Sequence, residues 1–163
     1  MKEEKHVVFR VNGELYSLNI ELVRAIEQQY SIIPLPEGPA NIKGMINLRG
    51  EIIPIYSLRA RFHMEEVPRT RDTQLVIAKH REIQLAFEVD SVVGISNITE
   101  EQIKDIPIVI KGDATNYIGG LVSVGDDIVV EISMQNIMSE SEWHSIEDLI
   151  HKKMDPDSED EKK

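Results

Sequence analysis

Short apolar runs separated by polar turns extend along most of this chain. Residues 44–58 contain two such runs joined at a polar, glycine-containing corner, a pattern that predicts a tight β-hairpin. Residues 7–11 and 14–18 flank an Asn12-Gly13 pair, and these residue types accept the positive φ angles of a type I′ turn. The hydrophobic pattern therefore predicts an all-β protein.

The hairpin pattern occurs twice in the chain. Gly44 aligns with Gly120, 76 residues later, and the alignment continues without a gap to Ser57 and Ser133. A looser repeat at an offset of 69 sets one apolar series over another: Tyr16, Leu18, Ile20 and Val23 over Leu85, Phe87, Val89 and Val92. We therefore expect two copies of one small β unit, with a groove between two barrels that could bind a partner or a ligand.

Breaks in the pattern suggest the boundaries of these units. The first barrel unit is expected at about 7–63 and the second at about 73–138, with a charged linker at 64–72 between them. One helical turn is expected at 19–23, an extended segment at 25–33 and a short helix at 58–62.

The C-terminal part has a helical pattern instead of a strand pattern. Residues 139–142 read Ser-Glu-Ser-Glu, which is typical of a capping box, and Trp143, Ile146, Leu149 and Ile150 form an amphipathic stripe. A helix is predicted at about 140–153, and the acidic tail at 155–163 has no apolar residue with which to pack.

Composition excludes several classes of function. The net charge of −11 disfavours contact with phosphate backbones, so no nucleic acid is expected as a partner. Cysteine is absent, which excludes disulfides and thiolate metal sites. The charged start lacks the apolar run of a secretory signal, and no segment is apolar for the ~20 residues that a membrane span needs. A soluble cytoplasmic protein without membrane insertion is expected.

Catalytic motifs are also missing from the sequence. The five histidines are scattered among predicted turns and ends, and neither a nucleophile elbow nor a glycine-rich phosphate loop is present. His144, Asp148 and His151 share one face of the predicted helix and could hold a divalent metal. A solvated polar face is the better interpretation. No enzyme activity, metal site or cofactor is predicted.

The motifs resemble those of the CheW family of bacterial chemotaxis coupling proteins. The Asn-Leu-Arg-Gly signature of that family is similar to residues 47–50, within the longer segment 43–55. Further similarities follow in one consistent order from about residue 6 to 138: Val8-Phe9-Arg10-Val11, Tyr16-Ser17-Leu18, Val23 with Ile26, Val89-Asp90-x-Val92 and Tyr117-Ile118-x-Gly120.

The resemblance implies a fold and a function. The fold is a single CheW-like domain over 1–163, built from two tandem, intertwined five-stranded SH3-like β-barrels with short helices and a C-terminal helix. The function is that of a non-catalytic adaptor that couples the cytoplasmic tips of methyl-accepting chemoreceptors to the regulatory domain of the histidine kinase CheA. A monomer is expected for the isolated protein, associated with receptor arrays through its partners.

The resemblance also implies the contact residues. The kinase-binding positions are Ile20, Ile26, Lys43, Ile52 and Ile53. The receptor-binding positions are Val23, Gly44, Asn47, Arg49, Leu75 and Ala86.

Four positions depart from the family pattern. Ala25 stands where the family has a glutamate that pairs with the motif arginine, so Arg49 is expected to lack that partner. Ser57 and Ser133 replace the usual aspartates, and Ala86 replaces a glycine. These departures affect the specificity for partners and leave the fold expectation unchanged.

Structural explanations exist for the same residues. The glycines at 44 and 50 can serve backbone geometry, Asn47 can bond its own turn, and Arg49 can simply be solvated. Ile52 and Ile53 point to opposite faces of one strand, so both cannot enter one core.

An alternative function is a small-β-barrel module that binds a small ligand or RNA in the groove between the barrels.

Overall fold

The computed structural model describes residues 3–35, 41–108, 112 and 115–154, so the predicted tail at 155–163 lies outside the described residues. The strands are β1 Glu3–Val11, β2 Glu14–Asn19, β3 Val23–Glu27, β4 Ile33–Pro34, β5 Ile42–Leu48, β6 Glu51–Tyr56, β7 Gln74–His80, β8 Ile83–Val89, β9 Ser91–Thr99, β10 Ile103–Lys104, β11 Ile118–Val124 and β12 Asp127–Ile132. The helices include η1 Ile20–Leu22, α1 Leu58–Arg61, η2 Glu100–Gln102 and α2 Glu140–Met154.

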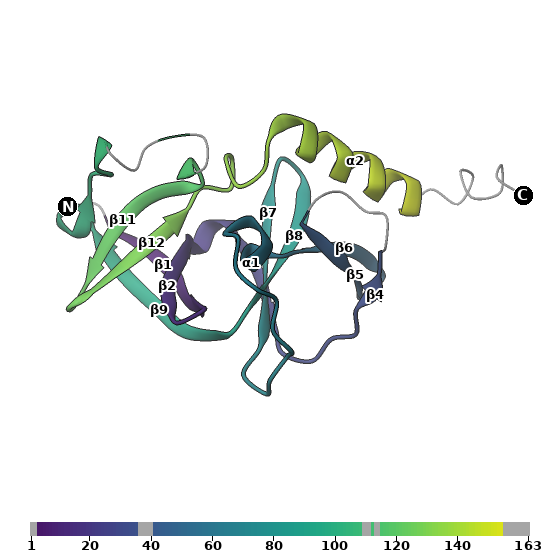
Figure 1. Ribbon diagram of the computed structural model, residues 1–163, viewed down its shortest axis with the longest axis horizontal. Coiled ribbons are helices and arrows are strands. Elements are labelled where there is room, and N and C mark those ends of the chain that lie inside the picture. Colours follow the sequence, from purple (N-terminus) through teal and green to yellow (C-terminus); the bar gives the residue numbers. More distant parts are fainter. Residues whose placement is uncertain (1–2, 36–40, 109–111, 113–114, 155–163) are drawn as a thin grey trace, which may run out of the picture.

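The strands form two curved sheets that lie side by side (Figure 1). One sheet has the order β10-β11-β12-β2-β1-β9, and we call it barrel A. The other has the order β3-β7-β8-β6-β5-β4, and we call it barrel B. Each sheet contains five strands of five or more residues and one two-residue strand, β10 or β4. The predicted all-β fold of two five-stranded SH3-like barrels is confirmed.

The two barrels exchange their hairpins. The β1–β2 hairpin comes from the first sequence repeat but pairs with β9 and β12 of the second. The β7–β8 hairpin comes from the second repeat but pairs with β3 and β6 of the first. Each barrel takes strands from both sides of the 64–72 linker, so the barrels are intertwined as the resemblance implied, and the units at 7–63 and 73–138 are sequence repeats, each of which gives one hairpin to the other barrel.

The exchanged hairpins pair in the same register in both barrels, at residues that the sequence repeat relates to each other. In barrel A the parallel β12–β2 pairing sets Glu131 opposite Ser17. In barrel B the parallel β6–β8 pairing sets Ile55 opposite Ala86. The repeat offset of 76 relates Glu131 to Ile55, and the offset of 69 relates Ser17 to Ala86. The two parallel pairings are therefore equivalent, and so are the strands of the two barrels.

The residues at the Asn12-Gly13 turn explain where the first predicted hairpin forms. Asn12 and Gly13 have φ angles of 54° and 82°, as a type I′ turn requires, and β1 pairs with β2 across them. The predicted extended segment at 25–33 is regular only in part, because β3 ends at Glu27 and the chain bends at 28–29 before β4.

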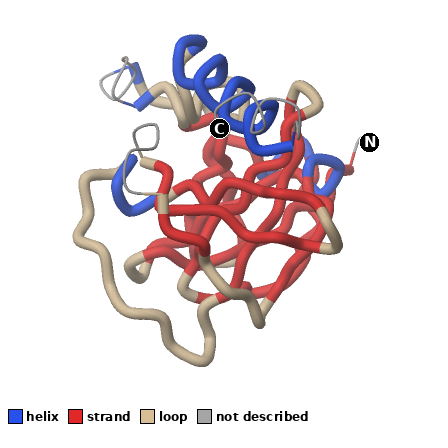
Figure 2. The backbone as a smooth tube through the Cα atoms, turned by 90° about the vertical axis from the view of Figure 1, so that its right-hand side faces the viewer, coloured by secondary structure: helices blue, strands red, loops and turns tan. Residues whose placement is uncertain are grey.

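Helix α2 lies along the outside of the strands (Figure 1, Figure 2). Its capping box is formed as predicted: the Glu142 N–H donates to Ser139 Oγ at 3.2 Å, and Ser139 N–H donates to Glu142 Oε1 at 2.9 Å. Trp143 and Ile146 are fully buried, whereas His144 on the opposite face is exposed. The helix therefore adds its apolar stripe to the core.

The space between the barrels is filled by side chains. The largest core cluster joins Phe9 and Leu18 of barrel A with Leu85 and Phe87 of barrel B, and Trp143 packs into it. Smaller clusters fill the two barrel interiors. The expected ligand-binding groove between the barrels is therefore corrected: in the described residues, that space is a shared hydrophobic core.

Candidate functional site

The β5–β6 turn presents an arginine at its apex. Arg49 and Gly50 have φ angles of 55° and 88°, which fits a two-residue type I′ turn. The Gly50 N–H donates to Asn47 Oδ1 at 3.0 Å, so Asn47 bonds its own turn as the structural explanation proposed. Both Asn47 and Arg49 are exposed. The turn thus holds Arg49 outward in a fixed backbone conformation.

Arg49 forms no ion pair with any other described residue. Position 25, where the resembling family has a glutamate, carries the methyl group of Ala25, which packs against the interior of barrel B. The five N–H donors of the guanidinium are therefore available for an acceptor on a partner.

Gly44 permits a close approach between β4 and β5. A Cβ atom built on this glycine would lie 2.5 Å from the Ile33 carbonyl oxygen and 2.7 Å from Ile32 Cγ2. Its backbone has no positive φ, so the glycine is needed for space. Gly44 is buried, and its role at a receptor contact can only be to shape the strand beside that contact.

Three residues predicted to contact partners lie inside barrel B. Leu75 and Ala86 have no exposed area, and Ile53 is 1% exposed. All three belong to one cluster with Ile46, Ile55 and Ile77. A partner docked on the folded protein cannot contact such side chains, so their direct binding role is corrected to that of barrel core.

The remaining predicted apolar positions lie at the surface or near it. Ile26 on the edge strand β3 is 38% exposed. Ile20 and Val23 are half-buried against the core shared by the two barrels. Ile52 is half-buried and faces away from Ile53, as strand alternation predicted, in a hollow that Ile150 of α2 also lines.

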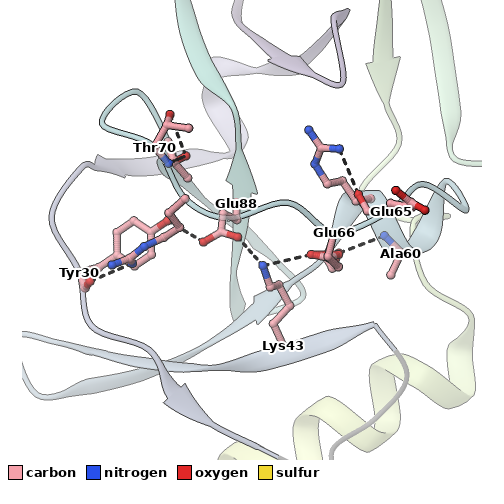
Figure 3. A network of polar contacts seen from close by, with 11 residues as sticks. Tyr30, Lys43, Ala60, Glu65, Glu66, Thr70 and Glu88 are labelled. Carbon is pink, nitrogen blue, oxygen red and sulfur yellow. Dashed lines mark hydrogen bonds and ion pairs between the residues drawn. The ribbon is translucent and has the colours of Figure 1, made fainter.

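Lys43 is engaged inside the protein (Figure 3). Its ammonium donates to Glu88 Oε1 and lies 3.1 Å from Glu66 Oε2. Burial opposes the charge of Lys43, but the hydrogen bonds and charges of Glu88 and Glu66 outweigh burial and raise the pKa of the amine. The predicted kinase contact at Lys43 would have to compete with these two carboxylates.

The same network also holds the 64–72 linker against barrel B (Figure 3). Tyr30 donates its hydroxyl to Glu88 Oε2 at 2.7 Å. The guanidinium of Arg69 lies 4.4 Å from the centre of the Tyr30 ring and donates to the Tyr30 carbonyl at 3.1 Å. The linker is therefore held against barrel B at several points.

A second set of contacts joins the barrels at Asp90. Asp90 Oδ2 accepts from the Asn12 N–H at 2.8 Å and from Arg59 Nη2 at 2.6 Å. The carboxylate thus ties the β1–β2 turn of barrel A to helix α1, which follows β6 of barrel B. This position belongs to the Val-Asp-x-Val motif, and its contacts indicate a structural role.

The serines at 57 and 133 retain the capping function that aspartate would supply. Ser57 Oγ accepts from the Ala60 N–H at 3.0 Å at the start of α1. Ser133 Oγ accepts from the Asn136 N–H at 3.3 Å after β12. Serine and aspartate are about equally good caps, so both departures leave the local structure intact. Ser57 also donates its hydroxyl to Glu66, a contact in which an aspartate could not be the donor.

The described residues contain one small enclosed cavity of interest near this network. It has a volume of about 20 Å³ and lies under the linker, with Lys43, Glu66 and Glu88 in its wall. This volume holds about one water molecule, so the cavity is too small for a metabolite.

A polar cluster that the sequence interpretation missed lies in barrel A. His6 has no exposed area, and it contacts Ser17 through Nδ1 at 2.9 Å and Glu4 through Nε2 at 3.0 Å. Glu131 lies beyond, with Oε2 at 3.8 Å from Nε2. Burial raises the pKa of the Glu131 carboxyl, with a contribution from Glu4, whereas His6 lowers it.

The expectation that the histidines occupy turns and ends fails for His6, which lies within β1. The aligned repeats contain a signal for this cluster, because His6, Ser17 and Glu131 align with apolar Leu75, Ala86 and Ile55. The candidate set His144, Asp148 and His151 is exposed on α2. Among the described side chains, only Glu4, His6 and Glu131 bring three potential ligand atoms within 4.8 Å of one another.

These features define a double-barrel protein of the SH3-like class with a projecting arginine hairpin and no assembled catalytic group in its described part. The CheW-like domain family matches residues 5–142, so the chain belongs to this family. The chain is similar to the chemotaxis protein CheW of Treponema pallidum, with 31% identity over 147 residues, which cover 88% of this chain and 86% of the relative.

Other relatives agree. The chemotaxis protein CheW of Bacillus subtilis is 33% identical over 104 residues, which cover 64% of this chain and 67% of that protein. The crystal structure of the scaffolding protein TtCheW from Thermoanaerobacter tengcongensis superposes with a TM-score of 0.75 at 32% identity, covering 82% of this chain and 90% of that one. The family consists of scaffolding proteins and not enzymes, so the prediction of a non-catalytic chemotaxis adaptor is confirmed at this level.

Within the described part of the chain, no helix combines the length and apolar character needed to cross a membrane.

Proposed function

We propose that this protein couples the cytoplasmic tips of chemoreceptors to the regulatory domain of the histidine kinase CheA. Membership in the CheW-like family over residues 5–142 supports a scaffolding role in chemotaxis. The main observation is that Arg49 is exposed at the apex of the β5–β6 turn and has no ion-pair partner among the described residues.

The receptor contact is assigned to the tip of the β5–β6 hairpin. Asn47 fixes the turn through its bond to Gly50, and Arg49 projects from it without an ion-pair partner in the described chain. The backbone of the turn is already fixed, so no loop has to be ordered when the arginine binds. Arginine is enriched among residues whose truncation costs the most binding energy, and its fork matches a carboxylate on a partner.

The kinase contact is assigned to the outer side of β3 and its surroundings. Ile26 is exposed on this edge strand, and half-buried Ile20 lies in the helical turn before the strand. Apolar side chains at an exposed edge favour packing against another small barrel, with the charged rim setting specificity. Lys43 is a weaker candidate because Glu88 and Glu66 already hold its ammonium.

The protein acts as a cytoplasmic monomer that reaches the receptor arrays through its partners. The net charge of −11 disfavours nucleic acids and anionic lipid surfaces as direct partners. The alternative of a small-ligand or RNA module has no support from the described residues, because side chains fill the space between the barrels.

Arg49→Ala tests the proposal. The substitution should weaken binding to a receptor-tip fragment by about 1–3 kcal/mol, which is the usual effect of truncating an interface hot spot. The free energy of unfolding should change little, because the exposed guanidinium has no intramolecular pair among the described residues. Isothermal titration against the receptor fragment and the CheA regulatory domain measures both affinities, and urea unfolding measures stability.

Arg81→Ala is the matched control. Arg81 is also an exposed turn arginine with a φ of 55°, in the β7–β8 hairpin, and it pairs with Glu140 on α2 at 2.9 Å. This variant should bind both partners like the parent protein. If Arg49→Ala also binds both partners like the parent, the hairpin tip is not the coupling surface.

A further inference from the structure

Three potential metal ligands converge at one end of the interior of barrel A. Glu4 and His6 project from β1, and Glu131 projects from β12. The Nε2 atom of His6 lies 3.0 Å from Glu4 Oε2 and 3.8 Å from Glu131 Oε2. The His6 side chain is 1% exposed, whereas those of Glu131 and Glu4 are 23% and 36% exposed. The histidine thus forms the floor of a site that opens to solvent through the two carboxylates.

The fold does not require polar residues at this place. Barrel B has the same strand order and register, and the equivalents of His6, Ser17 and Glu131 there are Leu75, Ala86 and Ile55. Those three apolar side chains pack inside barrel B. Burying a histidine beside carboxylates costs free energy that apolar packing would not, and the hydrogen bonds of His6 to Ser17 and Glu4, or a cation bound in their place, offset that cost.

A glycine leaves room for the carboxylate. Gly120 of β11 pairs with Glu131 of β12. A Cβ atom on Gly120 would lie 3.1 Å from Glu131 Oε1. The equivalent Gly44 in barrel B faces the backbone of Ile33 instead. In barrel A the missing side chain therefore leaves space beside Glu131.

We propose that Glu4, His6 and Glu131 bind one divalent transition-metal ion of the zinc class. A tetrahedral zinc ion with bonds of about 2.0–2.2 Å holds its ligand atoms roughly 3.3 Å apart, and the two observed separations bracket this value. One imidazole nitrogen and two carboxylate oxygens are ligands that zinc accepts, and a water on the open side completes four-coordination.

Ser17 orients the histidine for this purpose. Its Oγ lies 2.9 Å from His6 Nδ1 and is buried with it, so Nδ1–H can donate to the hydroxyl. That tautomer leaves the Nε2 lone pair directed at the two carboxylates, where a cation would lie. Such outer hydrogen bonds typically fix the ring of a metal-ligating histidine.

The bound ion would cross-link the two sequence repeats. His6 belongs to the first hairpin of the chain and Glu131 to the last, and β2 separates their strands in the sheet. Zinc that binds only the folded barrel would stabilise it by mass action.

Zinc titration of the full chain, after removal of metal with a chelator, tests this inference. We expect one zinc ion per chain by calorimetry and a higher melting temperature with zinc than with the chelator. Cobalt at the same site should show the intense visible absorption of four-coordinate geometry. Glu131→Ile, which copies Ile55 of barrel B, should fold and lose both effects. Ser17→Ala, which copies Ala86, should bind about 10–100-fold more weakly.

The double variant His144→Gln/His151→Gln is the control for binding to exposed histidines of α2. It should bind zinc like the parent protein. The inference is overturned if the parent shows no zinc-dependent rise in melting temperature, or if Glu131→Ile retains the zinc affinity. It is equally overturned if zinc binding is lost in the α2 double variant. None of these results depends on the receptor or the kinase, so they leave the proposed coupling function to its own test.

Discussion

Two glycines at equivalent repeat positions have different neighbours. A Cβ atom on Gly44 would lie 2.5 Å from a backbone oxygen, whereas one on Gly120 would meet only a side-chain oxygen at 3.1 Å. Backbone in a paired strand cannot move aside as a flexible side chain can. A motif glycine in the first repeat therefore has a steric function that its counterpart lacks.

Gly44→Ala should destabilise the protein by about 1–3 kcal/mol, because the added methyl group forces β4 away from β5. Gly120→Ala should cost less, since the Glu131 side chain can rotate. Urea unfolding of the two variants measures the difference. Equal losses of stability in the two variants would contradict the proposed steric difference between the two glycines.

Tyr30 should make stability depend on alkaline pH. Burial, together with the hydrogen bond to Glu88, raises the pKa of the Tyr30 phenol, although Arg69 opposes this. A pKa raised in the folded state gives stability that is present below the unfolded value of about 10 and is lost as pH rises above it. The stability difference between the parent protein and Tyr30→Phe should therefore shrink as pH rises above about 10. A constant difference in urea titrations at neutral and alkaline pH would contradict this.

At the scale of elements, hairpins and caps repeat while their surroundings differ. Ser57 and Ser133 occupy equivalent positions after β6 and β12, and each caps the turn that follows. Among the contacts of the described residues, Ser57 alone of the two also donates to a carboxylate, that of Glu66 in the linker. The same cap therefore serves one further contact in the first repeat.

Aspartate should be tolerated at one of these caps and not at the other. Ser133→Asp should leave the free energy of unfolding nearly unchanged, because aspartate caps as well as serine does. Ser57→Asp should cost about 0.5–1.5 kcal/mol, since the part-buried contact with Glu66 loses its donor and gains a like charge. Thermal denaturation of both variants compares them. If Ser57→Asp leaves the stability unchanged, the Lys43 ammonium compensates for the charges of both Glu66 and the new aspartate.

At the scale of the whole molecule, the exchanged hairpins make the barrels interdependent. The β1–β2 hairpin has its pairing partners in the second repeat, and the largest core cluster includes side chains of both barrels. Neither repeat can complete a barrel by itself, so the pair of barrels forms one cooperative unit.

Calorimetry should therefore show a single unfolding transition with equal calorimetric and van't Hoff enthalpies. A fragment of residues 1–63 should remain unfolded, because β1 and β2 lack β9 and β12. Two resolved transitions for the full chain, or a folded fragment by circular dichroism, would show that the barrels are independent.

The sequence by itself determined the local elements of this protein. Hydrophobic alternation, the Asn12-Gly13 pair and the Ser139 capping box depend on neighbours in the chain, and the hairpins and helix α2 formed where those signals lie. The internal repeat indicated two equivalent barrels, and the resemblance in motifs indicated the family. The outward position of Arg49 also follows from a short-range signal, the turn that it shares with Gly50.

The tertiary structure decided what depends on distant residues. Two equivalent hairpins have equivalent patterns, so the hydrophobic pattern could not tell which repeat each one joins, and only the structure shows which hairpins the intertwined barrels exchange. Apolar faces predict burial without naming the surface that covers them, so the expected groove became core and Leu75 and Ala86 became interior. His6 and Glu131 are distant in the chain, and only the folding of β1 and β12 into one barrel brings their charges together.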